Sequence, residues 1–131
     1  MTPGILRLDD DAQTHQGCVR AANEDSLLCM PREGVWVVAD GMGGHRNGKM
    51  ASERVVASVR NADLPLDFAS ACNAVAGGIH AANRSIFNEA TAAGDQMGST
   101  VVALILRERT FAVLWAGDSR AYLFRDNVLH Q

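Results

Sequence analysis

The chain has 131 residues, a formal net charge of −3, 47% hydrophobic residues and 21% charged residues. This length is typical of one domain, and the composition is typical of a globular protein, which excludes a disordered or collagen-like chain. The small net charge provides no long-range attraction to nucleic acid or to an anionic membrane, so we expect neither as a partner.

Cysteine usage and hydropathy indicate the compartment. The three cysteines are odd in number and form no CxxC pair, so we expect neither a disulfide framework nor a structural zinc site. No apolar run approaches the about 20 residues that span a bilayer, and the first residues lack the apolar core of a signal peptide. We therefore expect a cytoplasmic protein without membrane insertion.

The first part of the chain predicts strands followed by a glycine-rich segment. A polar edge strand is expected at 12–17, and a short apolar strand is expected at 26–30. Residues 35–39 are consecutive apolar residues rich in valine, which is typical of a strand buried on both faces. This strand leads directly into residues 40–48, four of which are glycine, so the backbone there can approach a ligand closely.

Two helices are expected in the middle of the chain. The first fits about residues 49–61 and is ended by the Asp63–Pro65 segment. The second fits about residues 67–93, where apolar residues recur at spacings of three and four. The Gly77–Gly78 pair within it should cost about 1 kcal/mol per glycine relative to alanine, so we expect close packing against a neighbour at this point.

The last part of the chain predicts antiparallel strands. Residues 101–106 and 111–116 are apolar and are separated by a charged turn. Residues 120–125 and 128–131 are expected to form a hairpin around the two-residue turn Asp126–Asn127. Because the chain stops inside this hairpin, we expect it to be cut from a longer domain.

Carboxylates adjoin three of the expected strands. Asp40 follows the buried strand, Glu24 and Asp25 precede another strand, and Asp118 follows residues 111–116. Each position taken alone is also explained by a turn or a solvated loop, in which an aspartate side chain bonds the backbone. Carboxylates together with free backbone carbonyls suit hard cations such as Mg²⁺ or Mn²⁺. The three positions together therefore favour a metal site.

The glycine-rich segment also permits other interpretations. Residues 43–49 match the G-x-x-x-x-G-K pattern of a nucleotide-binding P-loop, but Met50 stands where such a loop needs serine or threonine. His45 could serve as a general acid, since the ordinary pKa of imidazole lies near neutrality. No cysteine lies in a phosphate-binding loop before a helix, which argues against a cysteine-dependent phosphatase.

Four segments, in this order, resemble the metal-dependent protein phosphatases of the PPM (PP2C-like) family, especially those of bacteria. The segments are residues 17–25, which contain Asn23-Glu24-Asp25, residues 38–45, residues 98–100 and residues 116–120. The resemblance implies an α+β fold, with a sandwich of two antiparallel sheets flanked by helices and a two-metal site at one end. It also implies that residues 1–131 are the N-terminal half of one such domain.

The resemblance implies a metal-binding role for five residues. Asp40 would bridge two Mn²⁺ or Mg²⁺ ions, and the Gly41 carbonyl would bind one of them. Glu24 or Asp25 would reach the ions directly or through water. Asp118 is similar to an aspartate that holds a third, weaker ion.

The resemblance also implies the reaction. Arg20 would grip the substrate phosphate, and His45 is a candidate general acid, although the eukaryotic branch places its histidine differently. A metal-activated water would hydrolyse phosphoserine or phosphothreonine in proteins, opposing a bacterial serine/threonine kinase. Because family domains are longer and carry further metal-binding aspartates, a catalytically incomplete binding or regulatory module is the alternative, and a P-loop protein is a further one.

Overall fold

The computed structural model describes residues 6–43 and 45–131. The elements in chain order are β1 (Asp25–Met30), β2 (Val35–Met42), α1 (His45–Arg60), α2 (Phe68–Ala93), β3 (Gly98–Ser99), β4 (Val101–Arg107), β5 (Thr110–Ala116), β6 (Leu123–Arg125) and β7 (Val128–His130). None of the described helices is both long and apolar enough to cross a membrane.

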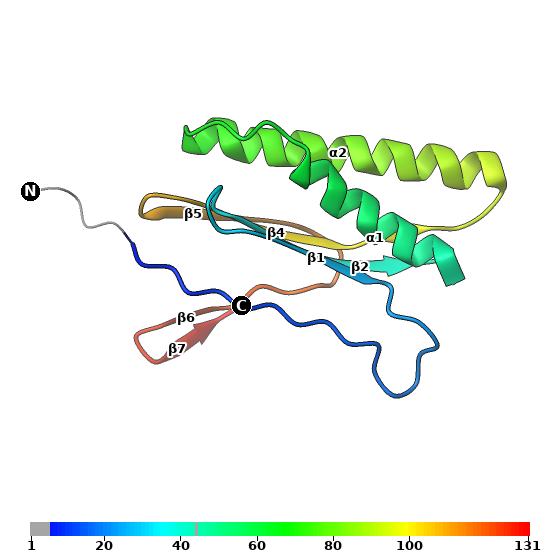
Figure 1. Ribbon diagram of the computed structural model, residues 1–131, viewed down its shortest axis with the longest axis horizontal. Coiled ribbons are helices and arrows are strands. Elements are labelled where there is room, and N and C mark those ends of the chain that lie inside the picture. Colours follow the sequence, from blue (N-terminus) through cyan, green and yellow to red (C-terminus); the bar gives the residue numbers. More distant parts are fainter. Residues whose placement is uncertain (1–5, 44) are drawn as a thin grey trace, which may run out of the picture.

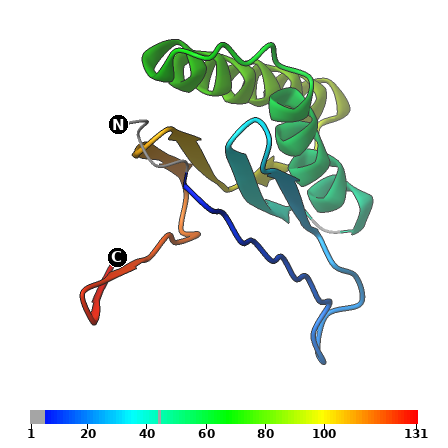
Figure 2. The same ribbon diagram turned by 60° about the vertical axis from the view of Figure 1, so that its left-hand side comes forward.

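The strands form two antiparallel sheets. The larger sheet has the order β1-β2-β4-β5, with β3 paired to the end of β2, and β6 and β7 form a separate hairpin. Helix α1 lies on one face of the larger sheet, and α2 packs mainly on α1 and also reaches β4 (Figure 1). The hairpin lies on the opposite side of the sheet from the helices (Figures 1 and 2). The expected α+β class, with antiparallel sheets and flanking helices, is confirmed.

The core lies between the larger sheet and the two helices. Alternate residues of the strands point to the helices, as strand geometry requires, and α1 and α2 contribute the apolar stripes predicted from their spacing. The core includes Val35, Val37, Ala39, Val55, Val59, Val75, Ile86, Val101, Ala103 and Ile105. Valine, isoleucine and leucine buried in this way provide most of the favourable free energy of folding.

The ends of α2 agree with the prediction. Asp67 precedes the helix and its carboxylate accepts a hydrogen bond from the Ser70 N–H at 2.9 Å, so the N-terminal cap is satisfied. Gly94 ends the helix with a left-handed backbone (φ 67°), a conformation that glycine adopts without strain. Both boundaries follow from local sequence alone.

The Gly77–Gly78 pair is only partly explained by close packing. A Cβ atom on Gly78 would lie 2.9 Å from the Ser58 carbonyl oxygen, so glycine at this position lets α2 approach α1. A Cβ atom on Gly77 would meet nothing within 4 Å. The predicted close approach is therefore confirmed for Gly78 and wrong for Gly77.

The prediction that residues 35–39 are buried on both faces is wrong for this chain. In β2 the residues alternate, so that Val37 is 3% exposed and Val38 is 50% exposed. Phe111 and Trp115 of β5 lie on the same uncovered face and are 42% and 70% exposed. We call this uncovered side of the larger sheet the open face. It is apolar, as the sequence pattern requires, but within residues 6–43 and 45–131 no layer comparable to α1 and α2 covers it (Figure 2).

Several boundaries differ from the sequence-based prediction because pairing partners decide them. Residues 12–17 form no strand. Strand β2 runs on to Met42 because Asp40 pairs with β1 and the next two residues, Gly41 and Met42, pair with β3. Helix α1 begins at His45, four residues before its predicted start at 49. Only residues 123–125 of the predicted strand 120–125 are paired.

Candidate metal centre

Asp25 and Asp40 lie opposite each other where β1 and β2 pair. Asp25 is the first residue of β1 and its register partner is Asp40, near the end of β2. The Asp25 carboxyl group acts on the Asp40 carboxyl group and raises its pKa. The antiparallel register therefore brings together two acidic side chains that are 15 positions apart in the sequence.

The surroundings of Asp40 disfavour its charged form. Partial burial of the carboxyl group raises its pKa most, although the residue as a whole is exposed. The hydrogen bond that protonated Asp40 donates to Asp25, and the negative charges of Asp25 and Asp118, raise this pKa further, whereas the positive charge of Arg20 opposes the change. A divalent cation would relieve this repulsion, and carboxylate oxygens are ligands that Mg²⁺ and Mn²⁺ prefer. The donor set thus fits a hard cation.

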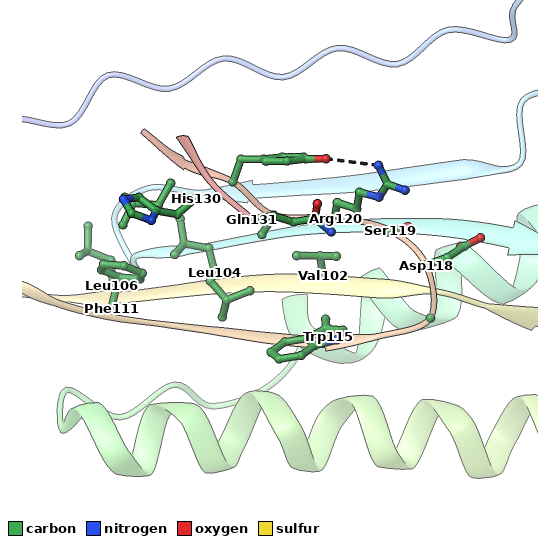
Figure 3. A pocket seen from close by; sticks show the side chains of 15 residues that line it. Val102, Leu104, Leu106, Phe111, Trp115, Asp118, Ser119, Arg120, His130 and Gln131 are labelled. Carbon is green, nitrogen blue, oxygen red and sulfur yellow. Dashed lines mark hydrogen bonds between the residues drawn. The ribbon is translucent and has the colours of Figure 1, made fainter. Parts of the chain in front are cut away.

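Asp118 and Arg20 complete the charged groups at this end of the sheet. Asp118 follows β5 in a turn where Gly117 has a φ of 99°, and Arg20 lies in the exposed loop before β1. Figure 3 shows Asp118 at one end of the cavity, which lies on the side of β4 and β5 away from α2, with its carboxylate directed away from the apolar side chains. The charges of both residues act on Asp40. Charged side chains from separate segments, those of Arg20, Asp25 and Asp118, therefore act on Asp40.

Glu24 occupies a different position from Asp25. A Cβ atom on Gly48 would lie 2.7 Å from both Cδ and Oε1 of Glu24, so the Glu24 carboxylate packs against the first turns of α1. That helix has no acidic residue of its own in its first turn, and a negative charge near a helix N-terminus is stabilising. Of the two acidic residues that the sequence left open, Asp25 is the one beside Asp40.

Gly41 and His45 are the remaining residues predicted for the site. Gly41 is buried, and its N–H donates to the Glu24 carbonyl at 3.1 Å. A side chain on Gly41 would collide with the Gly48 carbonyl oxygen, so glycine is required here. The side chain of His45 lies outside the described residues, and its role as an acid stays a prediction.

Thr100 is a residue that sequence reasoning left without a role. Its hydroxyl oxygen accepts a hydrogen bond from the Asp40 N–H at 3.0 Å and bonds the Ser119 hydroxyl at 2.7 Å. Its own N–H donates to the Asp40 carbonyl at 2.9 Å, and the residue is 3% exposed. Thr100 thus links Asp40 to the turn that carries Asp118. The Gly98-Ser99-Thr100 segment was the only signal for it.

The structure contradicts the P-loop alternative. Because α1 begins at His45, most of segment 43–49 is helical and forms no loop that could surround a phosphate. The Lys49 ammonium donates to the Asp25 carbonyl at 2.6 Å. The only lysine of the chain is therefore engaged with β1.

The described acidic residues provide a pair rather than a full coordination shell. Across 6–43 and 45–131, no three histidine, cysteine, aspartate or glutamate side chains lie close enough together to hold one ion. Asp118 affects Asp40 through its charge without joining the pair. Two oxygen ligands from Asp25 and Asp40 are what these residues offer a cation.

Comparisons with known proteins agree with this geometry. Residues 11–131 match the family model of protein phosphatase 2C. The serine/threonine protein phosphatase PstP of Mycobacterium tuberculosis is 34% identical over 122 residues, which cover 92% of this chain and 23% of PstP. PppA, a key regulatory component of T6SS in Pseudomonas aeruginosa, has a solved structure that is 39% identical with a TM-score of 0.86, covering 88% of this chain and 51% of that one.

A further solved structure bears on the metal. The catalytic domain of PstP in complex with two manganese ions is 31% identical with a TM-score of 0.76, over 89% of this chain and 51% of that chain. The chain thus spans about half the length of these solved structures and 23% of full-length PstP. On the match of its residues 11–131, the chain belongs to the protein phosphatase 2C family.

Proposed function

We propose that this chain provides the metal- and phosphate-binding end of a protein serine/threonine phosphatase. The observation that carries the proposal is the pair of carboxylates of Asp25 and Asp40, with the charge of Arg20 acting on it, in a chain of the protein phosphatase 2C family. Two carboxylates held together favour a divalent cation, and a nearby arginine favours a phosphoryl group. Such a combination suits hydrolysis of a phosphate ester.

The acidic residues have the metal-binding part in this proposal. Asp40 and Asp25 would hold Mn²⁺ or Mg²⁺ through their carboxylate oxygens, with the Gly41 carbonyl as a further ligand. Asp118, in the turn that Thr100 links to Asp40, would bind an additional and weaker ion. Divalent ions bound in such a site lower the pKa of a coordinated water, so that hydroxide is available near neutral pH.

Arg20 and His45 have the substrate part. The forked guanidinium of Arg20 would bind two phosphoryl oxygens, orient the ester and offset the negative charge that develops on those oxygens. His45 is the candidate to protonate the departing serine or threonine oxygen. Neither role needs a covalent bond between the phosphoryl group and the protein.

We propose phosphoproteins as substrates and a bacterial serine/threonine kinase as the opposing enzyme. The support is the similarity to PstP, whose name states a serine/threonine protein phosphatase. We also propose a cytoplasmic location, because Cys18, Cys29 and Cys72 are free thiols, and free thiols are kept reduced in that compartment.

Calorimetric titration with Mn²⁺ tests the metal part on the chain itself. Asp40→Asn should weaken binding by at least about tenfold, since a charged ligand is lost from the pair. Asp63→Asn is the matched control, because Asp63 is an exposed aspartate in the connection between α1 and α2. An unchanged titration in Asp40→Asn contradicts the proposed site.

Hydrolysis of p-nitrophenyl phosphate tests catalysis. Mn²⁺-dependent turnover that Asp40→Asn abolishes supports the phosphatase. A binding or regulatory module without catalysis is the second candidate, and it is favoured by the finding that the described acidic residues supply a pair and not a full shell. Mn²⁺ binding at a single weak site without turnover supports the module, whereas tight binding at two sites with turnover contradicts it.

A further inference from the structure

A chain of hydrogen bonds, buried at Ser26 and Ser52 and partly exposed at Lys49, joins α1 to the beginning of β1, next to the carboxylate pair. Ser52 of α1 is 0% exposed, and its hydroxyl lies 2.7 Å from both the Ser26 hydroxyl and the Glu24 carbonyl oxygen. The Lys49 ammonium lies 3.4 Å from the Ser26 hydroxyl and 2.6 Å from the Asp25 carbonyl oxygen. We call Lys49, Ser26 and Ser52 the relay.

The chemistry of the end groups fixes the direction of the relay. An ammonium group only donates, a carbonyl oxygen only accepts, and a hydroxyl donates a single proton. Lys49 therefore donates to Ser26, Ser26 donates to Ser52, and Ser52 donates to the Glu24 carbonyl. A longer contact of 3.1 Å joins Ser52 to the Lys49 carbonyl and does not alter this order. Hydrogen bonds that all point one way polarise and strengthen each other in a buried site.

The relay ends at the Glu24 carbonyl oxygen, which lies just before β1 and is bonded by both α1 and β2. The Glu24 carbonyl accepts the Ser52 hydroxyl from α1 and the Gly41 N–H from β2. The next residue is Asp25, whose register partner is Asp40. The bond from Ser52 holds Glu24, the residue before Asp25, against α1. The bond from Gly41 holds Glu24 against β2, the strand that carries Asp40.

Such a fixed position matters because Asp25 and Asp40 repel one another when both are charged. Like charges at this distance favour separation of the two strand ends, and a metal ion gains most from ligands that are already in place. The Gly41 N–H alone would leave the Glu24 carbonyl with one bond to the sheet. The Ser52 hydroxyl adds a second bond, from a rigid helix.

We propose that Ser52, supported by Ser26 and Lys49, is a positioning residue that holds Asp25 against Asp40 and thereby raises the affinity of the pair for a divalent cation. The proposal rests on the proposed function as far as the cation is concerned. The geometric part, the restraint on the Glu24 carbonyl, stands without any metal.

Two variants on the same helix separate positioning from helix stability. Ser52→Ala removes the last donor of the relay. Ser58→Ala is the matched control, because the Ser58 hydroxyl donates only to the Val55 carbonyl of its own helix, at 2.7 Å. We expect Ser52→Ala to weaken Mn²⁺ binding by about tenfold and Ser58→Ala to leave the affinity unchanged, both measured by calorimetry on the 131-residue chain.

A metal-free measurement distinguishes failure of the relay from failure of the proposed function. Hydrogen exchange of the Gly41 amide, which donates to the Glu24 carbonyl, should be several-fold faster in Ser52→Ala than in Ser58→Ala. If Asp40→Asn does not affect Mn²⁺ binding, the proposed function fails and this exchange still decides the relay. Equal Gly41 exchange in the two serine variants overturns the proposal, as does an unchanged Mn²⁺ affinity in Ser52→Ala where the unaltered chain binds Mn²⁺ at Asp40.

Ser26→Ala serves if Ser52→Ala does not fold. It removes the middle of the relay and leaves Ser52 able to donate to the Glu24 carbonyl, so the same two readouts should change in the same direction by a smaller factor. No change in either readout overturns the proposal.

Discussion

The two faces of the larger sheet are made of neighbouring residues and have opposite environments. On the helix side, Val37 and Ile105 are 3% and 0% exposed, whereas on the open face Val38 and Trp115 are 50% and 70% exposed. The residue types are equally apolar on both sides. A sheet that is apolar on both faces is typically covered on both faces. The apolar residues of a face therefore indicate that it is suited to burial, and the other elements of the fold determine whether it is buried.

The open face also has a depression. A cavity of about 760 Å³ lies between β4 and β5 and the segment that leads from Asp118 to Leu123 (Figure 3). Its walls include Leu104, Val113 and Trp115. The solved relatives are about twice as long as this chain, which covers 51% of their length. The candidate metal centre lies where this incompletely covered face ends.

The largest expected effect comes from placing a charge on one face or the other. Val37→Asp puts a carboxylate in the core without a partner and should cost several kcal/mol, enough to unfold the chain. Val38→Asp is the matched change on the neighbouring residue and should cost about 0.5 kcal/mol, because the side chain reaches water. Urea titration followed by circular dichroism measures both, and equal losses would mean that the open face is buried in solution.

Truncation of one large side chain on each face should give the next largest difference. Ile105→Ala leaves a cavity between the sheet and the helices and should cost about 2–4 kcal/mol. Trp115→Ala should cost less than about 1 kcal/mol, and it should reduce binding of an apolar dye to the open face. A loss of stability in Trp115→Ala as large as in Ile105→Ala would contradict the difference between the faces.

Substitutions at two neighbouring glycines of α2 test the packing of α2 on α1. They should change the stability of the chain in opposite directions. Gly77→Ala should stabilise the chain by about 0.5–1 kcal/mol, because alanine restricts the unfolded chain and meets nothing in the folded one. Gly78→Ala should destabilise it by about 1 kcal/mol or more, because the new Cβ is forced against the Ser58 carbonyl and separates the helices. Thermal unfolding of the two variants decides this, and stabilisation by both would contradict the close approach at Gly78.

The elements that the sequence predicted correctly depend on local signals. Helix α2 has its cap at Asp67 and its end at Gly94, and the β6–β7 turn has Asp126 and Asn127 with φ of 53° and 62°, the positive values that a two-residue hairpin needs. Each signal lies within a few residues of the feature it sets.

The features that sequence reasoning missed depend on distant partners. Thr100 bonds Asp40 across 60 positions, and Ser52 bonds the Glu24 carbonyl across 28. The early start of α1 at His45 accompanies the packing of Gly48 against Glu24, which no local propensity shows. In the candidate site, residue type and motif led to the acidic residues and Arg20 as candidates, and these roles stay predictions, but the separate positions of Glu24 and Asp25 required the register of β1 with β2.

The smallest expected effect concerns how the stability that the Asp67 cap gives to α2 depends on pH. The hydrogen bonds from Ser70 hold the pKa of Asp67 below its ordinary value of 3.8. A carboxyl group whose pKa is lower in the folded state adds stability above its unfolded pKa, and this stability is lost as pH falls through the folded pKa. Asp67→Ala should therefore lower Tm by a few degrees at pH 7 and by less below pH 3. Asp67→Asn keeps a capping oxygen but has no titrating carboxyl group. At pH 7 it should therefore lower Tm by less than Asp67→Ala does. Equal losses for Asp67→Ala at pH 7 and below pH 3 would show that the carboxylate charge does not contribute to the cap.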